Sequence, residues 1–229
     1  MSRGVFVTGT DTAVGKTVAA CALIHALKSR GLGVLPMKPI AAGAVTHAGG
    51  WANEDSIALL RAAGGDASKL ADVTPILLRE PMAPHIAAAR EKRVIALAPV
   101  RAAFDRLAAA CDFIVVEGVG GFEVPLGDGL DTIDLARAIG LPVVMVVGMR
   151  LGCLNHALLT ARAIRDSGLP FVGWIANAID PAMAVPGENV AALAQRLEAP
   201  LLGRLAFQMK LDPAALASSI DPGALLGTP

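Results

Sequence analysis

The segment from Gly9 to Thr17, GTDTAVGKT in one-letter code, constrains the fold more than any other part of the chain. It follows the short apolar run 5–8 and leads into a helical pattern that begins at Lys16. Glycine lets backbone N–H groups turn toward an anion without a Cβ clash, and a helix N-terminus adds free donors and a dipole. A strand, a glycine-containing turn and Gly-Lys-Thr at a helix start together predict a phosphate-binding loop.

Lys16 and Thr17 have the side chains that this loop needs. The Lys16 ammonium can reach the β- and γ-phosphate oxygens of a nucleotide, and the Thr17 hydroxyl is a hard oxygen ligand suited to Mg²⁺. Five residues separate Gly9 from Gly15, one more than the usual pattern has. We therefore interpret the segment as a longer variant of the phosphate loop, and a glycine-rich turn with a solvated lysine is the alternative.

Short apolar runs rich in β-branched residues alternate with longer helical patterns along the chain. The predicted strands are Val5–Thr8, Gly33–Met37, Phe113–Glu117, Val143–Val147, Phe171–Ala176 and Leu201–Leu205. The predicted helices are Lys16–Ser29, Glu54–Ala63, Pro99–Ala110, Thr132–Ile139, Leu154–Ser167 and Asn189–Leu197. This alternation predicts an α/β fold, with one domain over residues 1–229 and a doubly wound, mostly parallel sheet between helices on both faces. In such a sheet, ligands bind at the carboxyl ends of the strands.

The apolar composition raises the question of a membrane span, because hydrophobic residues make up 54% of the chain. The uncharged run 138–149 contains a proline and is too short to cross a bilayer, which needs about 20 apolar residues. A longer uncharged run, 39–53, is full of glycine and small residues, so we expect a loop there. The sequence therefore predicts no membrane-spanning helix.

Charge and cysteine usage narrow the partners and the compartment. Twenty basic residues balance twenty acidic ones without a basic run, which gives little support to nucleic acid or an anionic membrane as a partner. Cys21, Cys111 and Cys153 are isolated and have no metal-ligand spacing. The run 5–8 is also too short for the apolar region of a secretion signal. We therefore expect a reducing, cytoplasmic location.

Two carboxylates are placed to join the phosphate loop. The run Phe113–Glu117 is typical of a buried strand that ends in an acid, so Glu117 is either a metal-facing carboxylate or a simple strand terminus. The glycine-rich turn from Gly118 to Gly121 would let the backbone pass close to a ligand. Asp55 begins a predicted helix, where acids also serve as caps, so it is either a cap or a metal ligand.

Lys38 lies at the carboxyl end of the second predicted strand, between Met37 and Pro39. An open α/β sheet presents substrate-binding residues at that edge, and a lysine there can neutralise a phosphoryl group during transfer. An ordinary surface lysine at a strand terminus is the alternative.

Taken in order, these segments resemble the dethiobiotin synthetase family. The matching pieces are FVTGTDT (6–12), VGKT (14–17), MKP (37–39), Asp55, PHI (84–86), VEG (116–118), GG (120–121), VPL (124–126), LGCLNH (151–156), WIAN (174–177) and PLLG (200–203). They cover nearly the whole chain, and the longer spacing in the phosphate loop is itself typical of this family.

The resemblance implies an ATP-dependent reaction in biotin biosynthesis. In that family, 7,8-diaminononanoate, CO₂ (from bicarbonate) and ATP give dethiobiotin, ADP and phosphate, with Mg²⁺ as the metal ion. An amine of the substrate forms a carbamate, ATP phosphorylates the carbamate, and the second amine closes the ring by displacing phosphate. The family is a homodimer. Such phosphoryl transfer depends on positioning and charge neutralisation rather than on a nucleophilic side chain.

The resemblance also implies roles for named residues. Lys16, Lys38 and Thr12 would act on the reacting atoms, and Thr17, Asp55 and Glu117 would hold Mg²⁺. The ATP contacts would be Ala13, Val14, Gly15, Lys16, Thr17, Val18, Asp55, Glu117, Gly118, Val119, Gly120, Asn177, Leu205, Ala206 and Phe207. The substrate contacts would be Lys38, Ala42 and Gly121, together with Gly152, Cys153 and Asn155, whose turn would receive the substrate carboxylate across the subunit interface.

The chain departs from the family pattern at three positions. Ala42 stands where a serine commonly contacts the substrate, Ala178 follows Asn177 where an acid is frequent, and Ala206 replaces a usual proline. The first leaves substrate contacts open, and the other two leave nucleotide selectivity open.

The main alternative is a regulatory or partitioning ATPase that uses nucleotide to switch dimerisation. Such proteins usually carry a signature lysine near the start of the loop, where this chain has Asp11, and often a basic surface.

Overall fold

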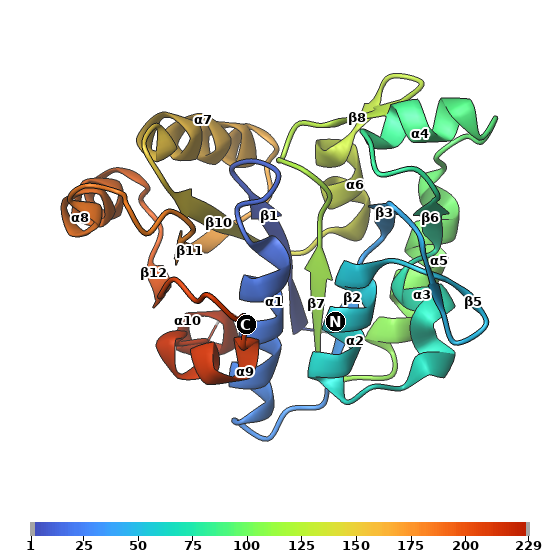
Figure 1. Ribbon diagram of the computed structural model, residues 1–229, viewed down its shortest axis with the longest axis horizontal. Coiled ribbons are helices and arrows are strands. Elements are labelled where there is room, and N and C mark those ends of the chain that lie inside the picture. The colour runs from blue at the N-terminus through green and yellow to red at the C-terminus, as the bar shows by residue number, and fades with distance from the viewer. Residues whose placement is uncertain (1–2, 228–229) are drawn as a thin grey trace.

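A six-stranded sheet forms the centre of the computed structural model, which describes residues 3–227 (Figure 1). Its strands are β1 (Arg3–Gly9), β2 (Val34–Met37), β7 (Phe113–Glu117), β10 (Val143–Met149), β11 (Phe171–Ala178) and β12 (Leu201–Leu205). They lie in the order β12-β11-β10-β1-β7-β2, and all the pairs are parallel. This arrangement confirms the predicted α/β class. Because the strand order reverses at β1, the crevice expected for a ligand opens at the carboxyl end of that strand.

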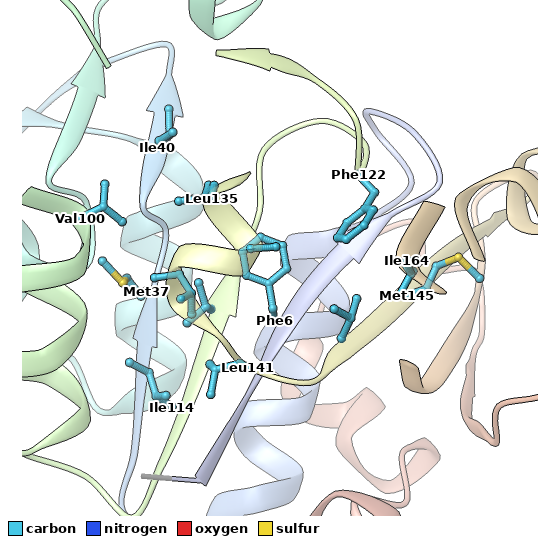
Figure 2. Packing of buried hydrophobic residues seen from close by; sticks show 14 of the residues in the cluster. Phe6, Met37, Ile40, Val100, Ile114, Phe122, Leu135, Leu141, Met145 and Ile164 are labelled. Carbon is cyan, nitrogen blue, oxygen red and sulfur yellow. The ribbon is translucent and has the colours of Figure 1, made fainter. Parts of the chain in front are cut away.

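The central strands of the sheet are buried on both faces, which explains why they are almost entirely apolar. Every residue of β7 and β10 is buried. Successive β1 side chains pack into two separate cores, Phe6 on one face and Val5 and Val7 on the other. Figure 2 shows the first core around Phe6. Each fully buried large apolar side chain contributes about 1.5–3 kcal/mol of transfer free energy.

Helices cover both faces of the sheet. The six main ones are α1 (Lys16–Lys28), α2 (Glu54–Ala63), α5 (Leu97–Ala108), α6 (Thr132–Ile139), α7 (Cys153–Asp166) and α8 (Pro186–Arg196). All lie where the sequence predicts them, with ends that shift by a few residues; α8 begins early because proline suits the first helical turn. The core of Val5 and Val7 includes α1 residues, and the core of Phe6 includes α5–α8 residues.

The prediction of a loop over residues 39–53 is wrong. The segment contains β3 (Ile40–Ala42), which pairs with β6 (Ile76–Leu78), and a hairpin of β4 (Val45–His47) and β5 (Gly50–Ala52). His47 pairs with Gly50, so the hairpin turn is Ala48–Gly49, and both residues have positive φ, 48° and 81°. Such a two-residue turn matches the twist of a hairpin, but it places an alanine where glycine or asparagine is usual.

The remaining elements are too short for their periodicity to appear in the sequence. They are α3 (Leu70–Val73), α4 (Pro84–Arg90), β8 (Pro125–Gly127), β9 (Leu130–Asp131), α9 (Pro213–Leu216), α10 (Gly223–Leu226) and 3₁₀ turns at Ala67–Lys69 and Ala217–Ser219. Figure 1 shows α9 beside α1, and α10 contacts β1 and β11. None of the helices within residues 3–227 is both long enough and apolar enough to cross a lipid bilayer.

Candidate active site

The phosphate loop connects β1 to α1 and has two residues with left-handed backbone. Gly15 has φ 82° and caps α1, and Ala13 has φ 59°. A Cβ on Gly15 would lie 2.0 Å from the Asn177 amide nitrogen, so this position requires glycine for space as well as for conformation. Ala13 holds a conformation that is unfavourable for alanine. The sequence gives no signal for that strain.

The side chains of Lys16 and Thr17 turn toward the centre of the site. The Lys16 ammonium donates to the backbone oxygen of Asp11 at 2.9 Å, and the Thr17 hydroxyl donates to Glu117 Oε1 at 2.9 Å. Burial lowers the pKa of Lys16 to about 8, with the Glu117 carboxylate raising it and the Lys38 ammonium lowering it further. An anion in the site would favour the charged form of this lysine.

Lys38 and Glu117 meet because their strands lie side by side. Met37 of β2 is in register with Val116 of β7, so the next residue of each strand reaches the same edge of the sheet. The Lys38 ammonium lies 2.5 Å from Glu117 Oε1, and the two side chains are 5% and 0% exposed. It also donates to the backbone oxygen of Gly118 at 3.2 Å. This buried pair excludes the interpretation of Lys38 as an ordinary surface lysine.

Asp55 completes the cluster around Lys38. Its Oδ2 atom lies 3.0 Å from the Lys38 ammonium. The cap of α2 is Asn53, whose side chain accepts a hydrogen bond from the Asp55 backbone, so the Asp55 carboxylate faces the cleft. Burial raises the pKa of Asp55, but the charge and hydrogen bond of Lys38, together with Thr17 and Lys16, outweigh burial, so the net pKa is lowered. Burial likewise lowers the pKa of Lys38, but Glu117 and then Asp55 outweigh it, and the net pKa is raised.

The oxygen atoms of Thr17, Asp55 and Glu117 fit a magnesium ion held together with phosphate. Glu117 Oε2 is buried and has no hydrogen-bond partner within residues 3–227. That stretch also contains no cluster of three or more histidine, cysteine, aspartate or glutamate side chains arranged for a metal. Mg²⁺ does not need such a cluster, because it is usually held by one or two carboxylates, substrate phosphates and water.

A cleft of about 1210 Å³ opens over this cluster. Its lining brings together many of the predicted site residues, namely Thr12, Ala13, Gly15, Lys16, Thr17, Val18, Lys38, Ala42, Asp55, Glu117, Val119 and Gly120. Gly118 does not line it, and a Cβ there would lie 3.1 Å from the Phe6 ring. The glycine at position 118 thus serves packing against the Phe6 ring of the core. Gly121 is also absent from the lining of the cleft.

The predicted adenine contacts lie together but outside this cleft. Asn177 at the end of β11 is in register with Leu205 at the end of β12, and Ala206 and Phe207 follow at the surface. The Asn177 amide donates to the backbone oxygen of Val14 at 2.9 Å, and both residues are buried. The asparagine therefore supports the phosphate loop.

The other predicted substrate contacts lie apart from the cleft of their own chain. Gly152 caps α7, Cys153 is buried and Asn155 is exposed, and none of them lines the cleft. Their role in binding across an interface stays a prediction.

Sequence reasoning missed two parts of the wall. They are Pro81–Pro84, which leads into α4 and includes its first residue, and Leu211–Ala214, which leads into α9 and includes its first two residues. Their prolines are the one signal that could have marked them as rigid turns.

The comparisons with known proteins agree with this geometry. The chain matches a model of an AAA domain over residues 3–215. It is 55% identical over 218 residues to the ATP-dependent dethiobiotin synthetase BioD of Aromatoleum aromaticum, covering 95% of this chain and 96% of that protein. It is 49% identical over 221 residues to the protein of the same name from Nitrosospira multiformis, covering 96% of each.

Solved structures share the fold at low identity. A ParA family ATPase from Chlorobium tepidum TLS has a TM-score of 0.56 at 15% identity, with 99% of this chain and 90% of that chain covered. The MinD cell division protein of Aquifex aeolicus has a TM-score of 0.57 at 17% identity, with 94% and 87% covered. These likenesses show the fold alone. The identity and coverage of the relatives above show that the chain belongs to the ATP-dependent dethiobiotin synthetase family.

Proposed function

We propose that the chain catalyses the ATP-dependent ring closure of 7,8-diaminononanoate with CO₂, which gives dethiobiotin, ADP and phosphate as a step of biotin biosynthesis. Family membership supports this function. The structural observation that supports it most is the buried ammonium of Lys38, which lies between Glu117 and Asp55 next to the phosphate loop. A positive charge placed there can stabilise the phosphoryl group during its transfer, and this reaction needs no nucleophilic side chain.

The proposed reaction has three steps. One amine of the substrate attacks CO₂ and loses a proton, which gives a carbamate. A carbamate oxygen then attacks the γ-phosphorus of ATP, and the bond to ADP breaks. The second amine attacks the carbonyl carbon of this mixed anhydride and loses a proton, phosphate leaves with the carbamate oxygen that had attacked the phosphorus, and a cyclic urea remains. Each step depends on close placement of the reactants, which the cleft can supply.

The two lysines would neutralise charge during phosphoryl transfer. In the structure, Lys16 and Lys38 carry two positive charges and Asp55 and Glu117 carry two negative ones within one cluster. The phosphates of ATP and the carbamate add several negative charges, so the lysines would exchange part of their pairing for the incoming oxygens. Thr12 lies in the cleft wall, where it would contact the reacting nitrogen.

Thr17, Asp55 and Glu117 would hold Mg²⁺, and the ion would supply further neutralisation of the β- and γ-phosphate oxygens when bound. The phosphates would contact the loop from Ala13 to Val18, and Val119 and Gly120 would lie near them. The base would lie toward Asn177 and the Leu205–Phe207 segment, although Asn177 also supports the loop. We infer a single synthetase domain over residues 1–229.

The substrate would lie between Lys38 and the Ala42 wall, and a homodimer would complete its site. The turn at Gly152, Cys153 and Asn155 would then contact the carboxylate of the substrate bound by the partner subunit, at a helix start suited to anions. Leu151 at this turn and Leu159 further along α7 are 94% and 56% exposed, which supports an interface there. We expect a cytoplasmic enzyme that has neither nucleic acid nor membrane as a partner.

The partitioning-ATPase alternative has less support. The likeness to ParA and MinD is one of fold, at 15% and 17% identity. In this chain, the position expected for a signature lysine is Asp11, which forms an ion pair with Arg150 of its own chain.

A substrate-dependence assay tests the proposed function. We expect ADP release to require 7,8-diaminononanoate and bicarbonate together, and mass spectrometry to identify a cyclic urea. Lys38→Ala should abolish the product, whereas Lys69→Ala, which removes a lysine from a surface ion pair, should leave it unchanged. Equal ADP release without the diamine would contradict the proposed function.

A further inference from the structure

A second polar cluster lies at the rim of the phosphate loop, on the side of β10. Asp11 follows β1 in the loop, and Arg150 is the first residue after β10. These strands are parallel neighbours, and the Thr10 backbone N–H donates to Val146 of β10 at 3.0 Å. The strand ends therefore bring together two residues that lie far apart in the sequence. The Arg150 guanidinium lies 2.6 Å from Asp11 Oδ2.

Three hydrogen bonds converge on Asp11. Its Oδ2 accepts from Arg150, its Oδ1 accepts from the Thr12 backbone N–H at 2.7 Å, and its backbone oxygen accepts from the Lys16 ammonium at 2.9 Å. Asp11 thus contacts both predicted catalytic residues of the loop, and within residues 3–227 Arg150 is its one hydrogen-bond partner from outside the loop.

The loop needs such a fixed point because part of its backbone is strained. Ala13 has φ 59°, and a non-glycine residue keeps this conformation only where the surroundings determine it. Asn177 holds the later part of the loop through Val14. The earlier part, from Thr10 to Thr12, has the strand contact of Thr10 and the ion pair of Asp11.

We propose that Arg150 is a positioning residue of the phosphate loop: through Asp11 it holds Thr12 and Lys16 in the geometry that phosphoryl transfer requires. Arg150 does not line the cleft, so it acts through Asp11 and not on the reacting atoms. Its backbone oxygen also accepts from Cys153 at the start of α7, which anchors Arg150 to a rigid element. The catalytic part of this inference rests on the proposed function.

A stabilising role for the whole fold is a weaker explanation of the pair. The Arg150 and Asp11 side chains are 42% and 45% exposed, and ion pairs at such positions add little to global stability. Loop geometry is more sensitive, because small displacements of a catalytic group lower the rate strongly. The pair should therefore affect turnover and nucleotide affinity more than thermal stability.

Four variants test the proposal in the full-length protein: Arg150→Gln, Arg150→Lys, Asp11→Asn and the double variant Arg150→Gln/Asp11→Asn. Arg30→Gln is the matched control, because Arg30 forms an exposed ion pair with Asp221, away from the loop. The measurements are kcat and KM for ATP and the diamine, Kd for MgADP by calorimetry, and Tm.

We expect Arg150→Gln and Asp11→Asn each to lower kcat by about one order of magnitude and to weaken MgADP binding, with Tm close to that of the control. Arg150→Lys should recover part of the loss. The double variant should lose no more than either single variant, because both remove the same contact.

Additive losses in the double variant would overturn the proposal, as would a change confined to KM for the diamine, which would indicate direct substrate contact. A fall in Tm large enough to explain the whole decrease in kcat and in MgADP affinity would overturn the proposal as well. MgADP affinity can be measured even if the wild-type chain shows no diamine-dependent turnover, so failure of the proposed function and failure of the positioning role remain distinguishable.

Discussion

The two walls of the cleft are built in different ways. The inner wall carries Lys38 and Glu117 on adjacent strands of the six-stranded sheet, where register fixes their contact and burial removes them from water. The outer wall comes from the short elements between β3 and α4, where local hydrogen bonds such as those of the Asn53 amide to Ala42 and Gly43 hold the backbone. The inner wall should therefore respond to substitution far more strongly than the outer wall.

Lys38→Ala tests the inner wall and should have the largest effect. We expect turnover to fall by orders of magnitude while MgADP still binds, because Lys38 faces the transferring group and not the loop that holds the nucleotide. Loss of the lysine also leaves Glu117 buried without its cation, at a cost of about 3–5 kcal/mol in unfolding free energy. Steady-state rates, calorimetry and chemical denaturation check these expectations. An unchanged rate would remove Lys38 from the mechanism.

Gly15→Ala tests the join between the phosphate loop and the sheet. The new Cβ would lie 2.0 Å from the Asn177 amide nitrogen, and the alanine would have to keep φ near 82°. We therefore expect weaker MgADP binding and a loss of about 1–3 kcal/mol in unfolding free energy. Gly31→Ala is the matched control, because Gly31 has φ 83° and no atom within 4 Å of a new Cβ. Equal effects of the two variants on nucleotide affinity would show that backbone strain, and not the contact with Asn177, matters.

Asn53→Ala tests the outer wall. The variant loses the cap of α2 and the two bonds to the β3 segment, so we expect a loss of about 0.5–2 kcal/mol and a higher KM for the diamine, with MgADP affinity unchanged. Asp131→Ala removes the cap of α6 and serves as the control. If both variants change KM for the diamine alike, Asn53 has no special place in the wall.

Alkylation of Cys21 should give the smallest effect, and it tests the burial and charge of the inner wall without a substitution. Burial, followed by the charges of Glu117 and Asp55, raises the pKa of this thiol to about 12, so it stays protonated at pH 8. Alkylation should modify the half-buried Cys111 first, although burial raises the pKa of that thiol too. While the pH is below the pKa of Cys21, the alkylation rate of this thiol should rise about tenfold for each unit by which the pH is raised. Rapid labelling of Cys21 at pH 8 would contradict this description of the wall.

The inner wall is also the part that the sequence predicts best. Lys38 follows one apolar strand and Glu117 ends another, and the carboxyl ends of parallel strands share one edge of a sheet, so the pattern places both side chains at that edge. The adjacency of β2 and β7 needs the strand order, which the residues do not encode locally. The sequence leaves the role of Asp55 open for a local reason, because Asn53 and Asp55 are both good helix caps and only the folded turn separates their roles.

The outer wall and the loop rim escaped prediction for other reasons. The β4–β5 turn places Ala48 at φ 48°, a conformation that alanine seldom adopts and that composition does not signal. The contact between Asp11 and Arg150 depends on β1 and β10 being neighbours, although the two residues lie 139 positions apart in the sequence. Long-range pairing of this kind leaves no periodic pattern to read.

The source of one oxygen atom in the released phosphate tests the central claim most directly. In a single turnover with ¹⁸O-labelled CO₂, unlabelled water, ATP, Mg²⁺ and the diamine, the carbamate oxygen that attacks the γ-phosphorus should leave with the phosphate. We predict phosphate that carries one ¹⁸O atom, formed together with the cyclic urea. Phosphate whose new oxygen comes only from water would contradict carbamate phosphorylation at this site.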